Sequence, residues 1–145
     1  MTHLISKKTL SLAAAKKIIE FAIVKANELE VGGVIAVVDD GGHLICLERI
    51  DGTMAAAANI AIGKAATAAV FNRPGDVLEH AITNERPVMA LLNSVSPFPY
   101  VPLKGAYPVE IDNQVVGAVA VAGAKNGEND EAIVLYAINR FKSLI

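Results

Sequence analysis

Two short apolar runs, separated by turn-forming residues, give the chain its clearest pattern. Residues 34–38 are continuously apolar and rich in β-branched side chains, and residues 44–47 form a second apolar run. The segment between them, residues 39–42, reads Asp-Asp-Gly-Gly and contains residue types that tolerate positive φ. Because Asp-Gly pairs favour tight hairpin turns, we predict two antiparallel strands joined at this point.

The register of this hairpin depends on which two residues form its loop. With Asp40-Gly41 as the loop, Val38 would lie opposite His43. With Gly41-Gly42 as the loop every pair would shift, and the sequence leaves both registers open. Neither run alternates between apolar and polar residues, as a strand with one wet face should. We therefore expect a sheet that is covered on both faces, by helices or by a second subunit.

Helical periodicity and a second turn signal organise most of the remaining chain. Apolar residues at helical spacing predict three long helices, over residues 11–30, 54–71 and 126–141. Two further apolar runs flank Asp112-Asn113 and predict a second hairpin, with strands over residues 107–111 and 114–122.

The region between residues 72 and 108 has a different character, because it contains all six prolines. Proline removes a backbone donor and interrupts regular helices. We expect two short helical pieces here, at about residues 74–82 and 87–92. A loop with one short edge strand should follow them.

The predicted helix over residues 54–71 is unusually apolar and rich in alanine. Between residues 55 and 70 its only charged residue is Lys64. A helix that is apolar almost all round is a buried helix. Asn59, Gly63 and Thr67 recur every four residues and form one narrow polar stripe beside Lys64. This stripe must meet a backbone, a ligand or another subunit, because buried polar groups need partners.

Composition narrows the classes of function that the chain can have. At 145 residues we expect one domain, spanning residues 1–145. A net charge of −2 and a pI near 5.9 argue against a nucleic-acid partner. Cys46 is the only cysteine, and neither a signal peptide nor a membrane-length apolar run is evident, so we expect a cytoplasmic protein. Hydrophobic residues make up 53% of the chain without any Trp, which predicts a homo-oligomer.

Three blocks of sequence resemble the successive signatures of a known family. They are VVDDGGHLICLERIDG at residues 37–52, IAIGKAATAAVF at residues 60–71, and LKGAYPVEIDNQVVGAVAVAGAKNGENDEAI at residues 103–133. Together they resemble the GlcG/HbpS family, which includes the C-terminal domain of PduO-type corrinoid adenosyltransferases. The resemblance runs from about Leu10 to Ile138. It departs from the family pattern at Ala106, where a second glycine is usual, and at Ala122, where serine is usual.

The resemblance implies a fold and a class of function. The implied fold is α+β, with a central antiparallel sheet of about five strands flanked by helices in a profilin-like arrangement, and subunits that assemble into oligomers. The implied function is non-enzymatic binding of haem, a corrinoid or another small anionic molecule, linked to a catabolic pathway of the diol, glycerol or glycolate type. Two alternatives stay open: an accessory protein of a catabolic enzyme complex without its own ligand, and an enzyme acting on a small metabolite.

Four residues in the first two blocks are candidates for ligand binding. Arg49 and Asp51 could form a handle for a propionate, or they could pair with each other and hold a turn. Lys64 and Thr67 could line a polar pocket for an anionic group. Alternatively, Lys64 could pair with a carboxylate such as Asp39 or Glu110 at a subunit contact, because a lone buried ammonium is costly.

The remaining candidates come from the proline-containing half of the chain. Lys104 and Tyr107 could supply a cation and an aromatic wall to a lid, or could simply pack the loop. His80 is a weak candidate for an axial ligand to haem iron. Met89 and Cys46 are better explained as core residues. No P-loop, dinucleotide-binding or nucleophile-elbow motif indicates a conventional enzyme.

Overall fold

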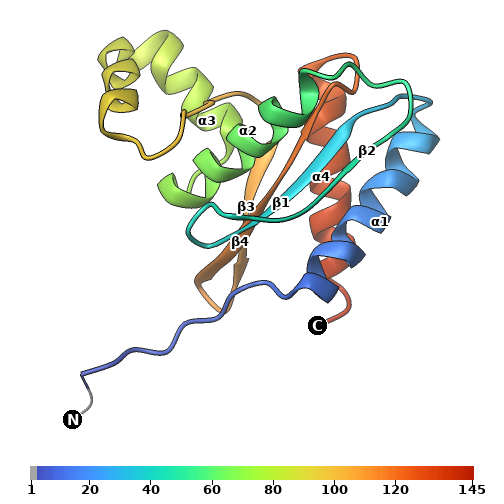
Figure 1. Ribbon diagram of the computed structural model, residues 1–145, viewed down its shortest axis with the longest axis horizontal. Coiled ribbons are helices and arrows are strands. Elements are labelled where there is room, and N and C mark those ends of the chain that lie inside the picture. The colour runs from blue at the N-terminus through green and yellow to red at the C-terminus, as the bar shows by residue number, and fades with distance from the viewer. Residues whose placement is uncertain (1–2) are drawn as a thin grey trace.

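The computed structural model describes residues 3–145 and shows a four-stranded antiparallel sheet packed between helices (Figure 1). The strands lie in the order β2-β1-β4-β3. The elements run along the chain as α1 (Leu12–Glu28), β1 (Val34–Asp39), β2 (Leu44–Arg49), α2 (Ala57–Phe71), α3 (Gly75–His80), the π-helical turn η1 (Ala81–Glu85), the 3₁₀-helical segment η2 (Pro87–Val95), β3 (Ala106–Ile111), β4 (Gln114–Ala122) and α4 (Gly127–Lys142).

This architecture confirms the predicted α+β fold and the order of its elements, with one correction. The sheet has four strands among the described residues, not about five. The expected edge strand in the proline-rich loop does not form: residues 96–105 are irregular. Pro97, Pro99 and Pro102 fall in this stretch and carry no backbone N–H to donate to a neighbouring strand.

Alternate residues of the two central strands build two different cores. On β1, Ile35 and Val37 face α1 and α4, whereas Ala36 and its neighbours of the same parity face α2. The face toward α1 and α4 is built from large aliphatic side chains. The face toward α2 is dominated by alanine, from the sheet at Ala36, Ala118, Ala120 and Ala122 and from the helix at Ala57, Ala61, Ala65, Ala68 and Ala69.

The expected cover on both faces holds for the central strands but not for the first hairpin as a whole. Every residue of β1 from Val34 to Val38 is buried. β2 lies at the edge of the sheet, and no residue in it is fully buried. The apolar run of β2 therefore leaves Leu44 about half exposed, at 48%.

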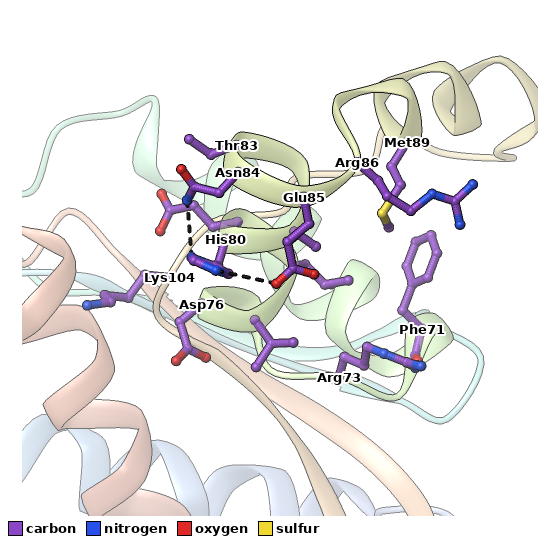
Figure 2. A pocket seen from close by; sticks show the side chains of 14 residues that line it. Phe71, Arg73, Asp76, His80, Thr83, Asn84, Glu85, Arg86, Met89 and Lys104 are labelled. Atoms are coloured by element: carbon purple, nitrogen blue, oxygen red, sulfur yellow. Dashed lines mark hydrogen bonds and ion pairs between the residues drawn. The ribbon is translucent and has the colours of Figure 1, made fainter.

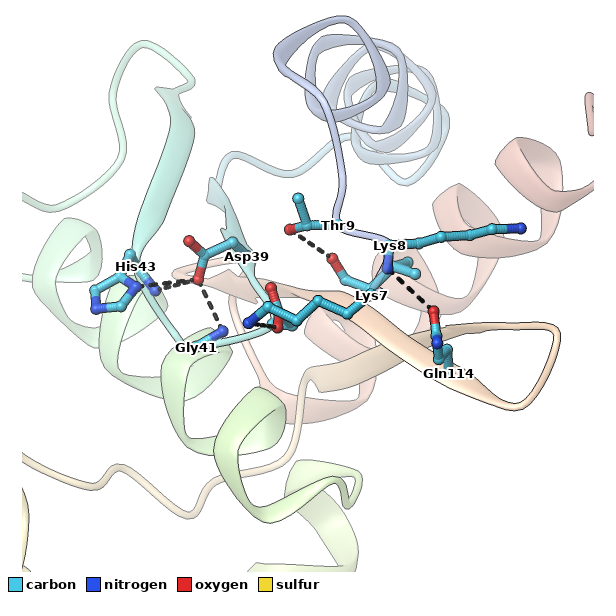
Figure 3. Close-up of polar contacts among 9 residues, drawn as sticks. Lys7, Lys8, Thr9, Asp39, Gly41, His43 and Gln114 are labelled. Atoms are coloured by element: carbon cyan, nitrogen blue, oxygen red, sulfur yellow. Dashed lines mark hydrogen bonds and ion pairs between the residues drawn. The ribbon is translucent and has the colours of Figure 1, made fainter. Parts of the chain in front are cut away.

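The turn between β1 and β2 has three residues, so neither of the two predicted registers is correct. Asp39 donates its N–H to the carbonyl of His43 over 2.8 Å, and Gly42 adopts a φ of +85°. A tight turn followed by a left-handed glycine inserts one bulged residue. Val38 consequently lies opposite Leu44. The Asp39 carboxylate accepts bonds from the N–H groups of Gly41 and His43 (Figure 3).

The segment before α1 is bonded to both hairpins, as Figure 3 shows. Lys7 forms an ion pair of 2.7 Å with Asp40, and the Lys8 N–H donates to the side chain of Gln114. Leu10 donates its N–H to the carbonyl of Val116 over 2.9 Å and is buried. These contacts give the acidic turn residues a structural role.

The close fit of α2 on the sheet predicts a strong asymmetry between two identical substitutions. Ala65→Leu adds bulk to a fully buried position in the alanine layer, whereas Ala13→Leu adds the same bulk to an exposed position on α1. We expect Ala65→Leu to lower the free energy of unfolding by about 1–3 kcal/mol, because overpacking forces neighbouring groups to shift. Ala13→Leu should change it little. Urea denaturation of both variants measures the difference, and equal effects would contradict a tightly packed layer.

Candidate functional site

A large cavity is lined mainly by a helical arm that projects from the body of the protein (Figure 1). We define the arm as residues 75–95, which form α3, η1 and η2 (Figure 1). The arm cleft has a volume of about 1140 Å³. Its lining includes one imidazole, one thioether, one aromatic ring, three cationic side chains and three carboxylates, contributed by His80, Met89, Phe71, Arg73, Arg86, Lys104, Asp76, Glu79 and Glu85 (Figure 2).

His80 is held by two neighbours from the turn that follows it (Figure 2). Its Nδ1 lies 3.1 Å from Nδ2 of Asn84, and its Nε2 lies 3.3 Å from Oε1 of Glu85. With the Asn84 amide donating to Nδ1, the ring proton sits on Nε2 and points at Glu85. The π-helical turn explains the second contact. A π-turn closes between residues five apart, as in the bond from the Arg86 N–H to the carbonyl of Ala81, and Glu85 follows His80 by five.

The cations of the arm cleft come from three different segments. Arg73 follows α2, Arg86 follows η1, and Lys104 precedes β3. Lys104 also lies 3.7 Å from a carboxylate oxygen of Glu128 and 4.0 Å from one of Glu131, both on α4. Such long, half-exposed pairs are weak and leave Lys104 able to reorient toward an anion.

Lys64 opens onto a second cavity, which we call the lysine cavity. This cavity has a volume of about 550 Å³, lies between α3 and the start of α4, and shares Glu79 and Lys104 with the arm cleft. The Lys64 side chain is only 3% exposed. Its Nζ donates to the carbonyl of Val121 over 2.6 Å and lies 3.3 Å from Oδ2 of Asp130.

The predicted need of Lys64 for a carboxylate is confirmed, but neither Asp39 nor Glu110 supplies it. Asp130 on α4 does, within the same chain. The other oxygen of Asp130 accepts the N–H of Ala124 over 3.0 Å. The pair therefore joins α2 to α4, which pack on opposite faces of the sheet.

Burial shifts both members of this pair toward their neutral forms. It lowers the pKa of Lys64, while the nearby Asp130 carboxylate opposes that shift. Burial likewise raises the pKa of Asp130, and the Lys64 ammonium opposes that shift in turn. Lys64 and Asp130 therefore form a buried amine–carboxylate pair that shares one proton in a low-dielectric site.

Thr67 does not join Lys64 in a common pocket. Its hydroxyl donates to the carbonyl of Gly63 over 2.6 Å and accepts the N–H of Val101 over 2.8 Å. The polar stripe of α2 thus meets the backbone of the proline-rich loop, one of the three partners expected for it. Thr67 also lines a third cavity of about 210 Å³, whose other walls are almost entirely apolar.

The other predicted residues lie away from these cavities. Arg49 ends β2 and Asp51 follows in an exposed turn, and within residues 3–145 the two form no ion pair with each other. Tyr107 on β3 donates its hydroxyl to Glu131 over 2.9 Å. Burial, and then this bond, raise the pKa of the phenol. Of the predicted residues, the structure brings His80 and Lys104 together in the arm cleft, whereas the sequence did not point to Arg73, Arg86, Glu85 or Asp130.

In the described part of the chain, no group of three or more His, Cys, Asp or Glu side chains could hold a metal ion by itself. Nor is any helix within residues 3–145 long and apolar enough to cross a membrane. Iron held at His80 would consequently need additional ligands from a cofactor.

The buried pair predicts a pH-dependent cost for removing its negative charge. Asp130→Asn keeps the shape and the bond to Ala124 but leaves the Lys64 ammonium buried alone, so we expect a loss of about 3 kcal/mol in unfolding free energy. Lys64 has a folded pKa below the ordinary 10.5. Between the folded pKa of Lys64 and 10.5, the unfolded chain binds more protons than the folded chain, so the unfolding free energy of the variant rises with pH. The cost of Asp130→Asn should therefore shrink as the pH approaches 10.5.

The matched control for this experiment is Glu20→Gln. It removes the exposed ion pair of 3.2 Å between Lys17 and Glu20 on α1. Exposed pairs contribute about 0–1 kcal/mol. Urea denaturation across a pH series measures both variants. A cost for Asp130→Asn no larger than that of the control would show that the buried pair is energetically unimportant.

Comparisons with known proteins agree on one family. The model of the family described as haem degrading protein HbpS-like matches residues 10–139. Protein GlcG of Escherichia coli K12 is 37% identical over 120 residues, which cover 81% of this chain and 84% of GlcG.

Solved structures share the fold over almost the whole chain. The Klebsiella pneumoniae protein ORFY superposes with a TM-score of 0.88 at 26% identity, covering 100% of this chain and 99% of its own. A double mutant of HbpS from Streptomyces reticuli superposes with a TM-score of 0.85 at 27% identity, covering 94% of this chain and 90% of the HbpS chain. The haem complex of PduOC superposes with a TM-score of 0.78 at 21% identity, covering 90% of this chain and 94% of the PduOC chain. At this level of identity it supports the fold alone. The chain belongs to the HbpS-like family, as its three sequence blocks indicated.

Proposed function

We propose that this protein binds a haem-type tetrapyrrole in the arm cleft, as a binding protein without catalytic turnover of its own. One observation carries the proposal: a cleft of about 1140 Å³ brings His80 together with three cations, three carboxylates and apolar side chains. Ligand sites typically have such volumes and combine apolar walls with a few polar groups. His80 would ligate the iron, and Arg73, Arg86 and Lys104 would meet the propionates.

The residues present fit such a group. Guanidinium groups bind carboxylates with paired hydrogen bonds, and two of the three cations are arginines. The His80 side chain is 63% exposed, so its contact with Glu85 is weak and can be exchanged for a metal bond. The ring proton would then sit on Nδ1, and the Asn84 amide would turn so that its oxygen accepts this proton and orients the ring. When bound, haem iron supplies redox and ligand-binding chemistry that the side chains lack.

One comparison supports haem over other anions, because the matching family is described as haem degrading protein HbpS-like. A corrinoid is the alternative tetrapyrrole, but it presents mainly neutral amides at its rim, which the three cations suit less well. The link to a diol, glycerol or glycolate pathway stays a prediction.

We also propose that the protein works as a homo-oligomer, with a second copy covering the arm. The 3₁₀-helical segment η2 leaves Val88, Leu91 and Val95 at 57%, 70% and 75% exposure. Three large aliphatic residues in one nine-residue segment form an apolar surface that monomeric proteins avoid. A copy of the same chain is the occupant we propose, because a chain with 53% hydrophobic residues and a net charge of only −2 favours self-association.

Titration with haemin, followed by visible absorption, tests the tetrapyrrole site. We expect saturable binding, and we expect His80→Ala to weaken it by roughly tenfold or more, which corresponds to about 1.4 kcal/mol or more of lost ligation. His43→Ala is the matched control, because His43 is also exposed but lies in the β1–β2 turn. A parallel titration with cobalamin separates the two tetrapyrroles. Absence of saturation with both, or equal losses in both histidine variants, would refute the assignment.

Light scattering on two matched leucine variants tests the oligomer. The wild-type protein should show a mass of at least twice its 15.2 kDa chain. Leu91→Glu places a charge on the arm and should reduce that mass, because burying an unpaired carboxylate is costly. Leu12→Glu places the same charge on α1, where Leu12 is 52% exposed, and should leave the mass unchanged. A wild-type monomer at micromolar concentration, or equal effects of both variants, would contradict the proposal.

A further inference from the structure

Lys64 is the one buried amine in the described chain, and the tetrapyrrole site does not use it. It lies on the alanine-rich helix α2, and it is one of the residues that line the lysine cavity. The pair with Asp130 explains how the charge is tolerated. It does not explain why the amine lies on the wall of a 550 Å³ cavity instead of being enclosed on all sides.

The surroundings of the amine are built for close approach. A Cβ added at Gly105 would come within 2.7 Å of Nζ and 2.6 Å of the Asp130 Cβ. Gly105 also has a φ of +104°, so a side chain would be strained there on both counts. The amine donates to the carbonyl of Val121 and to the carboxylate of Asp130, and these two partners hold it at the lining of the lysine cavity.

The geometry points to a covalent site: we propose that Lys64 forms an imine with a small aldehyde that enters the lysine cavity. Lysines that act this way are desolvated or lie near other cations, so that a fraction of the amine is neutral and nucleophilic. Lys64 meets the first condition, because it is buried, and Lys104 and Lys125 line the same cavity. Burial lowers its pKa, in agreement with the geometry.

The reaction balances with the groups present. Lys64 passes one proton to Asp130, and the neutral nitrogen attacks the carbonyl carbon. The carbonyl oxygen takes up that proton and becomes the hydroxyl of a carbinolamine. Loss of this hydroxyl with a second proton from nitrogen releases one water and leaves a protonated imine beside the Asp130 carboxylate. No oxidant or reductant is needed, and Asp130 ends in the form in which it began.

The cavity also limits the class of aldehyde. A volume of about 550 Å³ suits a small metabolite. Lys125 and Asn126 at its rim are exposed and can bond hydroxyl or anionic substituents. The shared residues Glu79 and Lys104 separate this site from the arm cleft. A short hydroxylated aldehyde is therefore the favoured class.

Reductive trapping on the folded wild-type protein tests the inference. The protein is treated with limiting glycolaldehyde and sodium cyanoborohydride near neutral pH, and the modified lysines are located by peptide mass spectrometry. We expect Lys64 to be labelled severalfold faster than the exposed Lys16, because burial lowers the pKa of Lys64 and so raises the fraction of neutral amine. The same reaction in denaturing urea should abolish the difference.

Two variants serve as matched controls. Lys64→Arg keeps the positive charge beside Asp130 and should remove the rapidly labelled lysine. Lys16→Arg should leave the rapid labelling of Lys64 unchanged. Because the comparison of Lys64 with Lys16 uses the wild-type protein, it holds even if Lys64→Arg fails to fold. Labelling of Lys64 no faster than that of Lys16 would overturn the proposal. Haemin binding is measured separately and bears only on the arm cleft.

Discussion

The layer of small side chains between α2 and the sheet is the constraint on which the rest of the structure depends. Alanines from the helix meet alanines from β1 and β4, so the helix can lie closer to the strands than larger residues would permit. This proximity lets the Lys64 side chain reach the end of β4, where it donates to the carbonyl of Val121. Larger residues would push the helix outward and separate that amine from Asp130.

The two faces of the sheet therefore have different structural roles. The face toward α1 and α4 carries branched aliphatic residues and supplies most of the hydrophobic stabilisation. The alanine face buries less apolar area per residue, but it sets the position of α2. The arm and the proline-rich loop are attached to that same helix: Thr67 bonds the loop at Val101, and Arg73 leads into α3. The positions of both cavities therefore depend on the position of α2, which contributes lining residues to each.

Local patterns predicted the elements well, because hydrophobic periodicity and Asp-Gly turns act over a few residues. They also identified Lys64 as a buried charge in need of a carboxylate. They failed where the outcome depends on contacts between distant segments. Asp130 lies in the first turn of α4, and nothing in the local sequence connects it with a lysine 66 residues earlier. The pairing of His80 with Glu85 was hidden for another reason, since five-residue spacing faces one side only in a π-helical turn.

The border between the two cavities links their chemistry. Glu79 on α3 and Lys104 before β3 line both. Lys104 is held only by long contacts to Glu128 and Glu131, so it can turn toward either space but not toward both at once. A propionate in the arm cleft and an anionic group in the lysine cavity would compete for it. Competition for a single ammonium couples two sites without any movement of the backbone, and the coupling must act equally in both directions. The family fold alone does not provide this link, because it depends on where Lys104 lies.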